Sequence, residues 1–177
     1  MIIIRDLQHK CRCYTNTVTV KGMLKMLLTD GTSANVFYRL AQIAQRIKLG
    51  LIGWVLLDMN KALNGCLIGR NASFGEGFVL MHPVGVIING GVIGGKNIVI
   101  ESGVVIGAAH NGLPLKLPVL GDDIFIGAGA KVLGGIRIGS HVTIGANAVV
   151  VHDVPDGATV VGIPAKVIRM KDKHASS

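Results

Sequence analysis

Aliphatic residues recur at intervals of six along much of the second half of the chain. The unbroken series is Leu120, Ile126, Val132, Ile138, Ile144 and Val150. A second small or aliphatic residue stands four positions after each of these anchors, and glycine follows most of them. A helix repeats near 3.6 residues and a strand every two, so neither explains this period. Six residues make one flat side and one corner of a triangular coil, which predicts a parallel β-helix of hexapeptide repeats.

An earlier block of the same repeats begins near Ile68. Its anchors are Ile68, Phe74, Leu80, Val86 and Val92. The interval then slips to eight between Val92 and Ile100, and a gap of fourteen after Ile106 predicts an excursion from the coil. We therefore expect the winding to be interrupted at two places.

The N-terminal part has helical spacing instead. One apolar stripe consists of Val36, Leu40, Ile43 and Ile47. Steps of three and four predict a helix that Ser33 caps and Gly50 ends, and residues 51–63 predict a second helix. We expect Trp54 and Phe37 to pack this region onto the repeats. The stretch TVTVKGMLKMLL fits either a strand followed by a short helix or another arrangement.

These patterns together predict an all-β fold with an N-terminal α-helical extension. We expect a mostly helical region over 1–61, a β-helix domain over 62–169 and a flexible tail over 170–177. The helices are expected to cover one open end of the coil, since short parallel strands leave unpaired groups there.

Composition supports a tightly wound coil and a basic surface. The chain has 25 glycines among 177 residues, 4% aromatic residues and a formal net charge of +8. Basic residues gather before and after the repeats, which favours an anionic partner such as a phosphorylated small molecule or anionic lipid. We expect no nucleic-acid partner, because aromatic and basic residues are not interleaved.

The cysteines and the longest apolar run indicate in which cellular compartment the protein is expected. Cys11, Cys13 and Cys66 are an odd set without a pairing pattern, so we expect reduced thiols in a cytoplasmic protein. The run from Leu49 to Leu57 is about half the length that a helix needs to span a membrane. The basic N-terminal segment could still contact a membrane surface peripherally. No metal is expected, because the histidines lack zinc-site spacing.

Four stretches carry a resemblance to a known family. They read MHPVGVII (81–88), VIESGVVIGA (99–108), IGAGAKVLGGIRIGSHVTIGANAVV (126–150) and VPDGATVVGIPAKVI (154–168). The chain resembles the left-handed β-helix acyltransferases of the hexapeptide-repeat superfamily, in the serine O-acetyltransferase-like branch. The resemblance implies a left-handed parallel β-helix, a homotrimer, and acetyl-CoA bound as co-substrate between neighbouring subunits.

The resemblance also implies a catalytic histidine. The family motif H-x-x-G-[VI]-[VI] maps onto His82, Gly85, Val86 and Ile87. Imidazole titrates near neutrality and so suits a general base that takes the proton of an attacking hydroxyl. His110, in the expected excursion, either assists this base, lines the acceptor pocket or is an exposed loop residue.

The donor site is expected along the second half of the coil. Small side chains leave room for the pantetheine arm, and basic ones can meet the phosphates of acetyl-CoA. The candidates are Gly107, Ala108, Ala128, Gly129, Ala146, Lys166 and Arg169.

The acceptor is predicted from departures from the family pattern. Serine acetyltransferases carry acidic residues at the positions of Leu67 and Met81 and a histidine at that of Leu117. A zwitterion would therefore find few charged partners, since buried charges need paired groups. The slip and the Ile88-Asn89 pair resemble colanic-acid and capsule-type acetyltransferases.

We therefore predict O-acetylation of a sugar or exopolysaccharide precursor, either a small molecule or a lipid-linked sugar. Asn89 and Asn111 are the candidate substrate-binding residues. Two alternatives remain, namely a serine O-acetyltransferase of cysteine biosynthesis and a non-catalytic β-helix scaffold.

Overall fold

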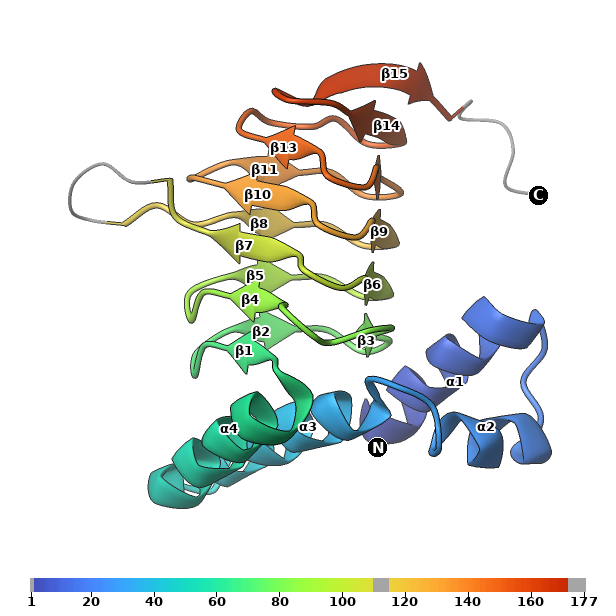
Figure 1. Ribbon diagram of the computed structural model, residues 1–177, viewed down its shortest axis with the longest axis vertical. Coiled ribbons are helices and arrows are strands. Elements are labelled where there is room, and N and C mark those ends of the chain that lie inside the picture. The colour runs from blue at the N-terminus through green and yellow to red at the C-terminus, as the bar shows by residue number, and fades with distance from the viewer. Residues whose placement is uncertain (1, 110–114, 172–177) are drawn as a thin grey trace.

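The computed structural model describes residues 2–109 and 115–171. Helices occupy the chain up to Asn64 and strands follow from Leu67, so that a coil of short strands stands on a helical base (Figure 1). The helices are α1 (Ile2–Thr15), α2 (Val20–Met26), α3 (Thr32–Arg46) and α4 (Gly50–Asn64).

The strands form three sheets that are the three walls of the coil. The five-stranded sheet A holds β1 (Leu67–Ile68), β4 (Ile87–Ile88), β7 (Val105–Gly107), β10 (Lys131–Leu133) and β13 (Val149–Val150). The four-stranded sheet B holds β2 (Ser73–Phe74), β5 (Ile93–Gly94), β8 (Val119–Leu120) and β11 (Arg137–Ile138). The six-stranded sheet C holds β3 (Val79–Leu80), β6 (Ile98–Ile100), β9 (Ile124–Ile126), β12 (Thr143–Ile144), β14 (Ala158–Val161) and β15 (Lys166–Met170).

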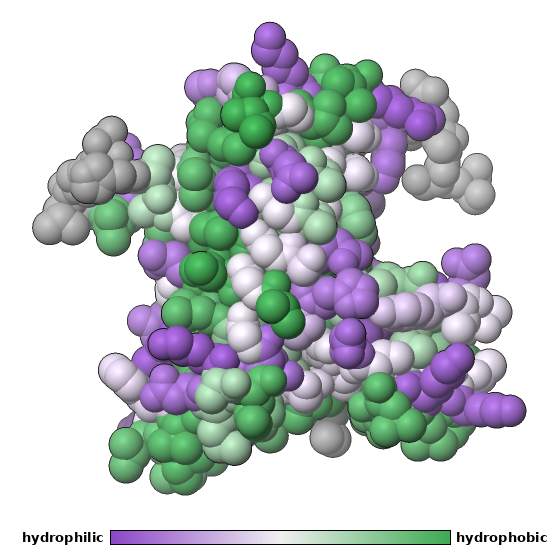
Figure 2. Space-filling view, in the orientation of Figure 1, coloured by the Kyte–Doolittle hydropathy of each residue, from purple (hydrophilic) through white to green (hydrophobic). Residues whose placement is uncertain are grey.

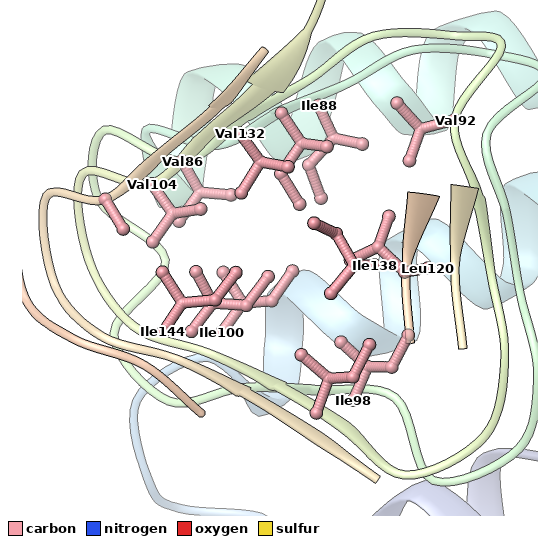
Figure 3. Close-up of a cluster of buried hydrophobic side chains, with 14 of the residues drawn as sticks. Val86, Ile88, Val92, Ile98, Ile100, Val104, Leu120, Val132, Ile138 and Ile144 are labelled. Carbon is pink, nitrogen blue, oxygen red and sulfur yellow. The ribbon is translucent and has the colours of Figure 1, made fainter. Parts of the chain in front are cut away.

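The core is a stack of aliphatic side chains inside these walls. Strands pair in parallel with the strand one turn away, and among the strands of the described residues only β15 pairs antiparallel, with β14. Leu120 pairs with Ile138 in sheet B, and both side chains point into the coil (Figure 3). All the anchors from Leu120 to Val150 are buried. The predicted parallel β-helix of hexapeptide repeats is therefore confirmed.

The predicted position of the eight-residue slip is wrong. Leu80 pairs with Ile100 and Ile88 pairs with Ile106, so the two extra residues lie between Leu80 and Ile88. Gly94 occupies the anchor position opposite Phe74. A Cβ at Gly94 would lie 2.4 Å from Cδ1 of Phe74, so the glycine leaves room for that ring. Because Gly94 has no aliphatic side chain, the sequence analysis assigned this anchor to Val92 instead.

The excursion lies where the sequence predicted it, between β7 and β8. Its returning arm, residues 115–118, packs on two glycines of the coil. A Cβ at Gly91 would lie 2.4 Å from Cδ1 of Leu117, and one at Gly135 would lie 2.4 Å from Cβ of Lys116. Glycine at these two corners therefore lets the arm approach the coil.

Three details of the helical part differ from the prediction. Gly31, with φ +78°, is the N-cap of α3, whereas Ser33 donates a hydrogen bond of 2.6 Å to Oδ1 of Asn64. Gly50 begins α4 rather than ending α3. The stripe containing Ile43 and Ile47 faces outward, and α3 buries the face of Tyr38 and Arg39 instead.

Helix α3 joins the helical base to the first turn of the coil. The guanidinium of Arg39 is buried and donates to Oδ2 of Asp6 at 2.7 Å and to the carbonyl oxygen of Phe74 at 2.9 Å. Oδ1 of Asp6 accepts hydrogen bonds from the backbone amides of Gly77 and Phe78. The helices therefore cover this end of the coil, as expected.

Large apolar side chains remain exposed on the helical base. Figure 2 shows apolar surface gathered at this end of the molecule, where Leu28, Leu51 and Leu63 are among the exposed residues. Trp54 is 56% exposed, and the guanidinium carbon of Arg70, in the coil, lies 5.4 Å from the centroid of its ring. Within the described residues, no helix has the length and apolar character needed to cross a membrane.

Candidate active site

His82 lies in the corner that contains the two extra residues. This corner, His82 to Gly85, joins β3 of sheet C to β4 of sheet A. Gly85 has φ +75°, a backbone conformation that glycine adopts without strain. The added length interrupts the regular winding, so the imidazole is presented outward with 55% of its side chain exposed.

An open cavity of about 500 Å³ lies beside this corner. Its walls come from three segments: the turn between α2 and α3, the end of α4, and the corner of His82. Ser33 and Asn64 form a neutral polar part of the wall, since Ser33 donates to Asn64, whose amide in turn donates to Oδ1 of Asn60 at 3.0 Å. The cavity thus combines an exposed imidazole with groups that can bind a small polar molecule.

Asp30 brings a carboxylate into the same cavity. Its Oδ2 lies 3.5 Å from Nδ1 of His82, and 78% of its side chain is exposed. No sequence pattern indicated this contact, because no spacing rule connects a turn in the helical region with a corner of the coil. The cavity therefore contains a carboxylate, although Leu67 and Met81 stand where the family pattern has acidic residues.

Three of the predicted donor-site residues share one corner of the coil. Ala128 and Gly129 join β9 to β10, and Ala146 lies between β12 and β13, so all three occupy the corner between sheets C and A. The amide of Gly129 donates to the carbonyl of Ser102 at 2.7 Å, and the amide of Gly103 donates to that of Val84 at 3.0 Å. This column of corners therefore leads turn by turn down to His82.

Lys131 is a feature of this column that the sequence did not single out. Its Nζ donates to the carbonyl oxygens of Gly103 at 2.8 Å and Gly129 at 2.9 Å. The ammonium group thus satisfies two stacked carbonyls and adds a positive charge to the corner that the predicted donor residues share. The sequence did not predict this contact, because the lysine lies within a run of small residues that matches no motif.

The other predicted residues lie elsewhere. Gly107, Ala108 and Asn89 are at the opposite edge of sheet A, where the chain turns toward sheet B. Lys166 and Arg169 belong to β15, at the far end of the coil from the helices (Figure 1). Within one chain these residues do not line the cavity of His82. His110 and Asn111 lie outside the described residues.

A thiol nucleophile does not fit the site. Cys66 is fully buried at the start of the coil, and burial raises the pKa of its thiol to about 12, so the reactive thiolate is scarce at neutral pH. In residues 2–109 and 115–171, no three His, Cys, Asp or Glu side chains are grouped closely enough to hold a metal ion. An imidazole acting on a hydroxyl is the chemistry that the cavity supports best.

Comparisons with known proteins agree with this architecture. Residues 118–152 match the family model described as bacterial transferase hexapeptide (six repeats). A structure of serine acetyltransferase from Brucella abortus strain S19 in complex with coenzyme A superposes with a TM-score of 0.85 at 26% identity, covering 97% of this chain and 68% of that one.

Two curated relatives are serine acetyltransferases. The protein from Synechococcus elongatus is 38% identical over 83% of this chain, which spans 60% of that protein's length. The protein from Helicobacter pylori strain J99 is 38% identical over 81% of this chain and 84% of its own length. This identity and coverage show that the chain belongs to the serine acetyltransferase family, whose members are acyltransferases built from hexapeptide repeats.

Proposed function

We propose that this protein transfers the acetyl group of acetyl-CoA to a hydroxyl group, with His82 as the general base. The observation that carries the proposal is the exposed imidazole of His82 at the edge of the open cavity, on the corner that breaks the six-residue period. Membership of an acyltransferase family and the coenzyme A bound to the Brucella relative support the donor.

The reaction requires only proton transfers and one acyl transfer. Nε2 of His82 takes the proton of the acceptor hydroxyl while its oxygen attacks the thioester carbonyl. The carbon–sulfur bond then breaks, and the departing thiolate takes the proton from the imidazolium. The products are an acetyl ester and free coenzyme A, so no electrons are exchanged with another reactant.

The corner column suits the donor. Parallel strands are spaced about 4.8 Å apart, so three turns from His82 to Ala146 span roughly 14 Å along the coil. The small side chains of Ala128, Gly129 and Ala146 leave space for a pantetheine arm on this path. Lys166 and Arg169, beyond its far end, are proposed to meet the phosphates.

A homotrimer of left-handed coils is part of the proposal. Leu67 and Ile87 are neighbours on sheet A, and each is more than 40% exposed. Such an apolar rib on a flat wall is suited to burial against a second copy. A neighbouring subunit would bring its own walls close to the corner column, which forms only one side of a groove in the single chain.

L-serine is the favoured acceptor. The named relatives are serine acetyltransferases, and the carboxylate of Asp30 supplies a charge that the sequence pattern had not placed near His82. A sugar hydroxyl is the second candidate, because Ser33 and Asn64 offer neutral hydrogen-bonding groups. The predicted closeness to colanic-acid and capsule-type enzymes, the role in exopolysaccharide synthesis, the lipid-linked acceptor and the peripheral membrane contact stay predictions.

The test is an assay of coenzyme A release from acetyl-CoA with L-serine and with a panel of sugars, in which mass spectrometry identifies the product. Release that depends on L-serine and yields O-acetylserine is the expected result. Release with sugars alone would replace the acceptor but keep the acetyl transfer. The absence of release with every acceptor would contradict the proposal and favour a scaffold.

A further inference from the structure

The imidazole of His82 has one carboxylate within 4 Å among the described residues, and it comes from the helical base rather than the coil. The two groups meet through Nδ1 of the ring and Oδ2 of Asp30. A neutral imidazole holds one proton, and an acceptor at Nδ1 keeps that proton there. Nε2 then has its lone pair free. This arrangement would prepare a general base, provided that Asp30 is held in place.

The backbone of Asp30 is held by several contacts. The buried ammonium group of Lys10 donates to the carbonyl oxygen of Asp30 and, at 3.0 Å, to Oγ1 of Thr32. The next residue, Gly31, has φ +78°, and a Cβ added there would lie 2.0 Å from the carbonyl oxygen of Leu80. The turn therefore rests directly on strand β3, two residues before His82.

Asn35 fixes the same turn to the same strand. Its Nδ2 donates to the carbonyl oxygen of Phe78 at 2.6 Å, and its Oδ1 accepts from the amide of Leu80 at 2.8 Å. The side chain of Asn35, at the start of α3, thus makes the backbone hydrogen bonds to Phe78 and Leu80 that a neighbouring strand would otherwise make. Because Asp30 and His82 extend from the two sides of this joint, buried groups fix the separation of their backbones, although both side chains reach solvent.

We propose that Asp30 is the positioning residue of His82 and that it selects the tautomer in which Nδ1 carries the proton. The inference rests on the proposed role of His82 as base. A separation of 3.5 Å is long for a hydrogen bond, but catalytic hydrogen bonds are often long before substrate binds and shorten in the complex. Exposed ion pairs add little stability, so the role of this pair is orientation.

The coil supplies a matched control pair. Nδ1 of His141 lies 3.4 Å from Oδ2 of Asp123, and both side chains are partly exposed, as in the Asp30 pair. Asp123 has φ +55°, which asparagine also tolerates, so Asp123→Asn is expected to fold normally. It removes the same kind of contact at a corner away from the cavity of His82.

The experiment compares Asp30→Asn, Asp30→Glu and Asp123→Asn in the full chain. The first substitution keeps the backbone carbonyl that Lys10 binds, so the turn should persist. We expect Asp30→Asn to lower kcat with L-serine by about tenfold or more, because an amide can hold the wrong tautomer. The KM for acetyl-CoA should stay within about twofold. Asp30→Glu should recover part of kcat, and Asp123→Asn should match the unsubstituted protein.

A spectroscopic measurement makes the test independent of the acceptor. Nitrogen-15 NMR of histidine-labelled protein reports which ring nitrogen holds the proton, and the signals absent from His82→Ala identify that residue. We expect the proton on Nδ1 in the unsubstituted protein and a change of tautomer in Asp30→Asn. An Asp30→Asn variant with unchanged kcat and unchanged tautomer would overturn the inference. If L-serine is not a substrate, the proposed acceptor fails, and the tautomer alone decides the role of Asp30.

Discussion

Lys10 places an ammonium group in a nearly closed space between α1 and the turn of Asp30. Only 2% of the residue is exposed, and burial lowers the pKa of Lys10 from 10.5 to about 8. Between these two values the unfolded chain binds one proton more than the folded chain. The free energy of unfolding therefore rises with pH in this interval.

We predict that the free energy of unfolding rises by about 1 kcal/mol between pH 8 and pH 9, relative to Lys10→Met. Denaturant titrations of both proteins at the two pH values measure the difference. Cys66 acts in the opposite direction above pH 9, because burial raises the pKa of its thiol to about 12. A difference that falls over the interval would show that Lys10 is not buried as described.

Single positions of the coil core were predictable from the sequence, whereas the partner of His82 was not. An aliphatic residue at every sixth position can face only inward in a triangular coil, so Val132 and Ile144 are both fully buried. Asp30 and His82 are far apart in the sequence, and their contact depends on how α3 packs on β3. No periodic pattern contains that information.

The strand β5 shows how a glycine can conceal the register of a repeat. The pattern followed Val92 because Gly94, the true anchor position, has no side chain. The local sequence still fits the fold, since Phe74 on the neighbouring strand fills the space that an aliphatic residue would occupy. The eight-residue interval consequently belongs to the corner of His82 and not to a corner of the regular coil.

We predict that Gly94→Ala destabilises the protein by about 1–3 kcal/mol, because the new methyl group must displace Phe74 and Ile98 from a filled core. Gly90→Ala is the control. Its Cβ would have ordinary contacts, the nearest at 3.5 Å, and we expect a change below about 0.5 kcal/mol. Chemical unfolding at one fixed protein concentration measures both. Equal effects of the two substitutions would contradict the assigned register.

A buried ion pair, Arg39 with Asp6, holds the helical base against the coil. Arg39 and Asp6 are less than 5% exposed, and together they bind four backbone groups near the first turn of the coil. A second ion pair between the same parts, Arg5 with Glu76, has a separation of 4.0 Å and is largely exposed. The two pairs therefore allow a direct comparison.

We predict that Asp6→Ala destabilises the protein by about 3–5 kcal/mol, because the buried guanidinium of Arg39 loses its counter-charge. Arg5→Ala should change the free energy of unfolding by less than about 1 kcal/mol. Far-ultraviolet circular dichroism and denaturant titration report both helices and strands. A loss of helix in Asp6→Ala with an unchanged unfolding transition of the coil would mean that the two parts fold independently.

The role of His82 as the base is tested most directly by steady-state acetyl transfer in His82→Ala. His141→Ala is its matched control, because that histidine is also exposed beside a carboxylate, on another corner of the coil. With acetyl-CoA and L-serine, we expect His82→Ala to lose about 100-fold or more of kcat while His141→Ala keeps the original value. Full turnover in a folded His82→Ala protein would rule out this role for the imidazole.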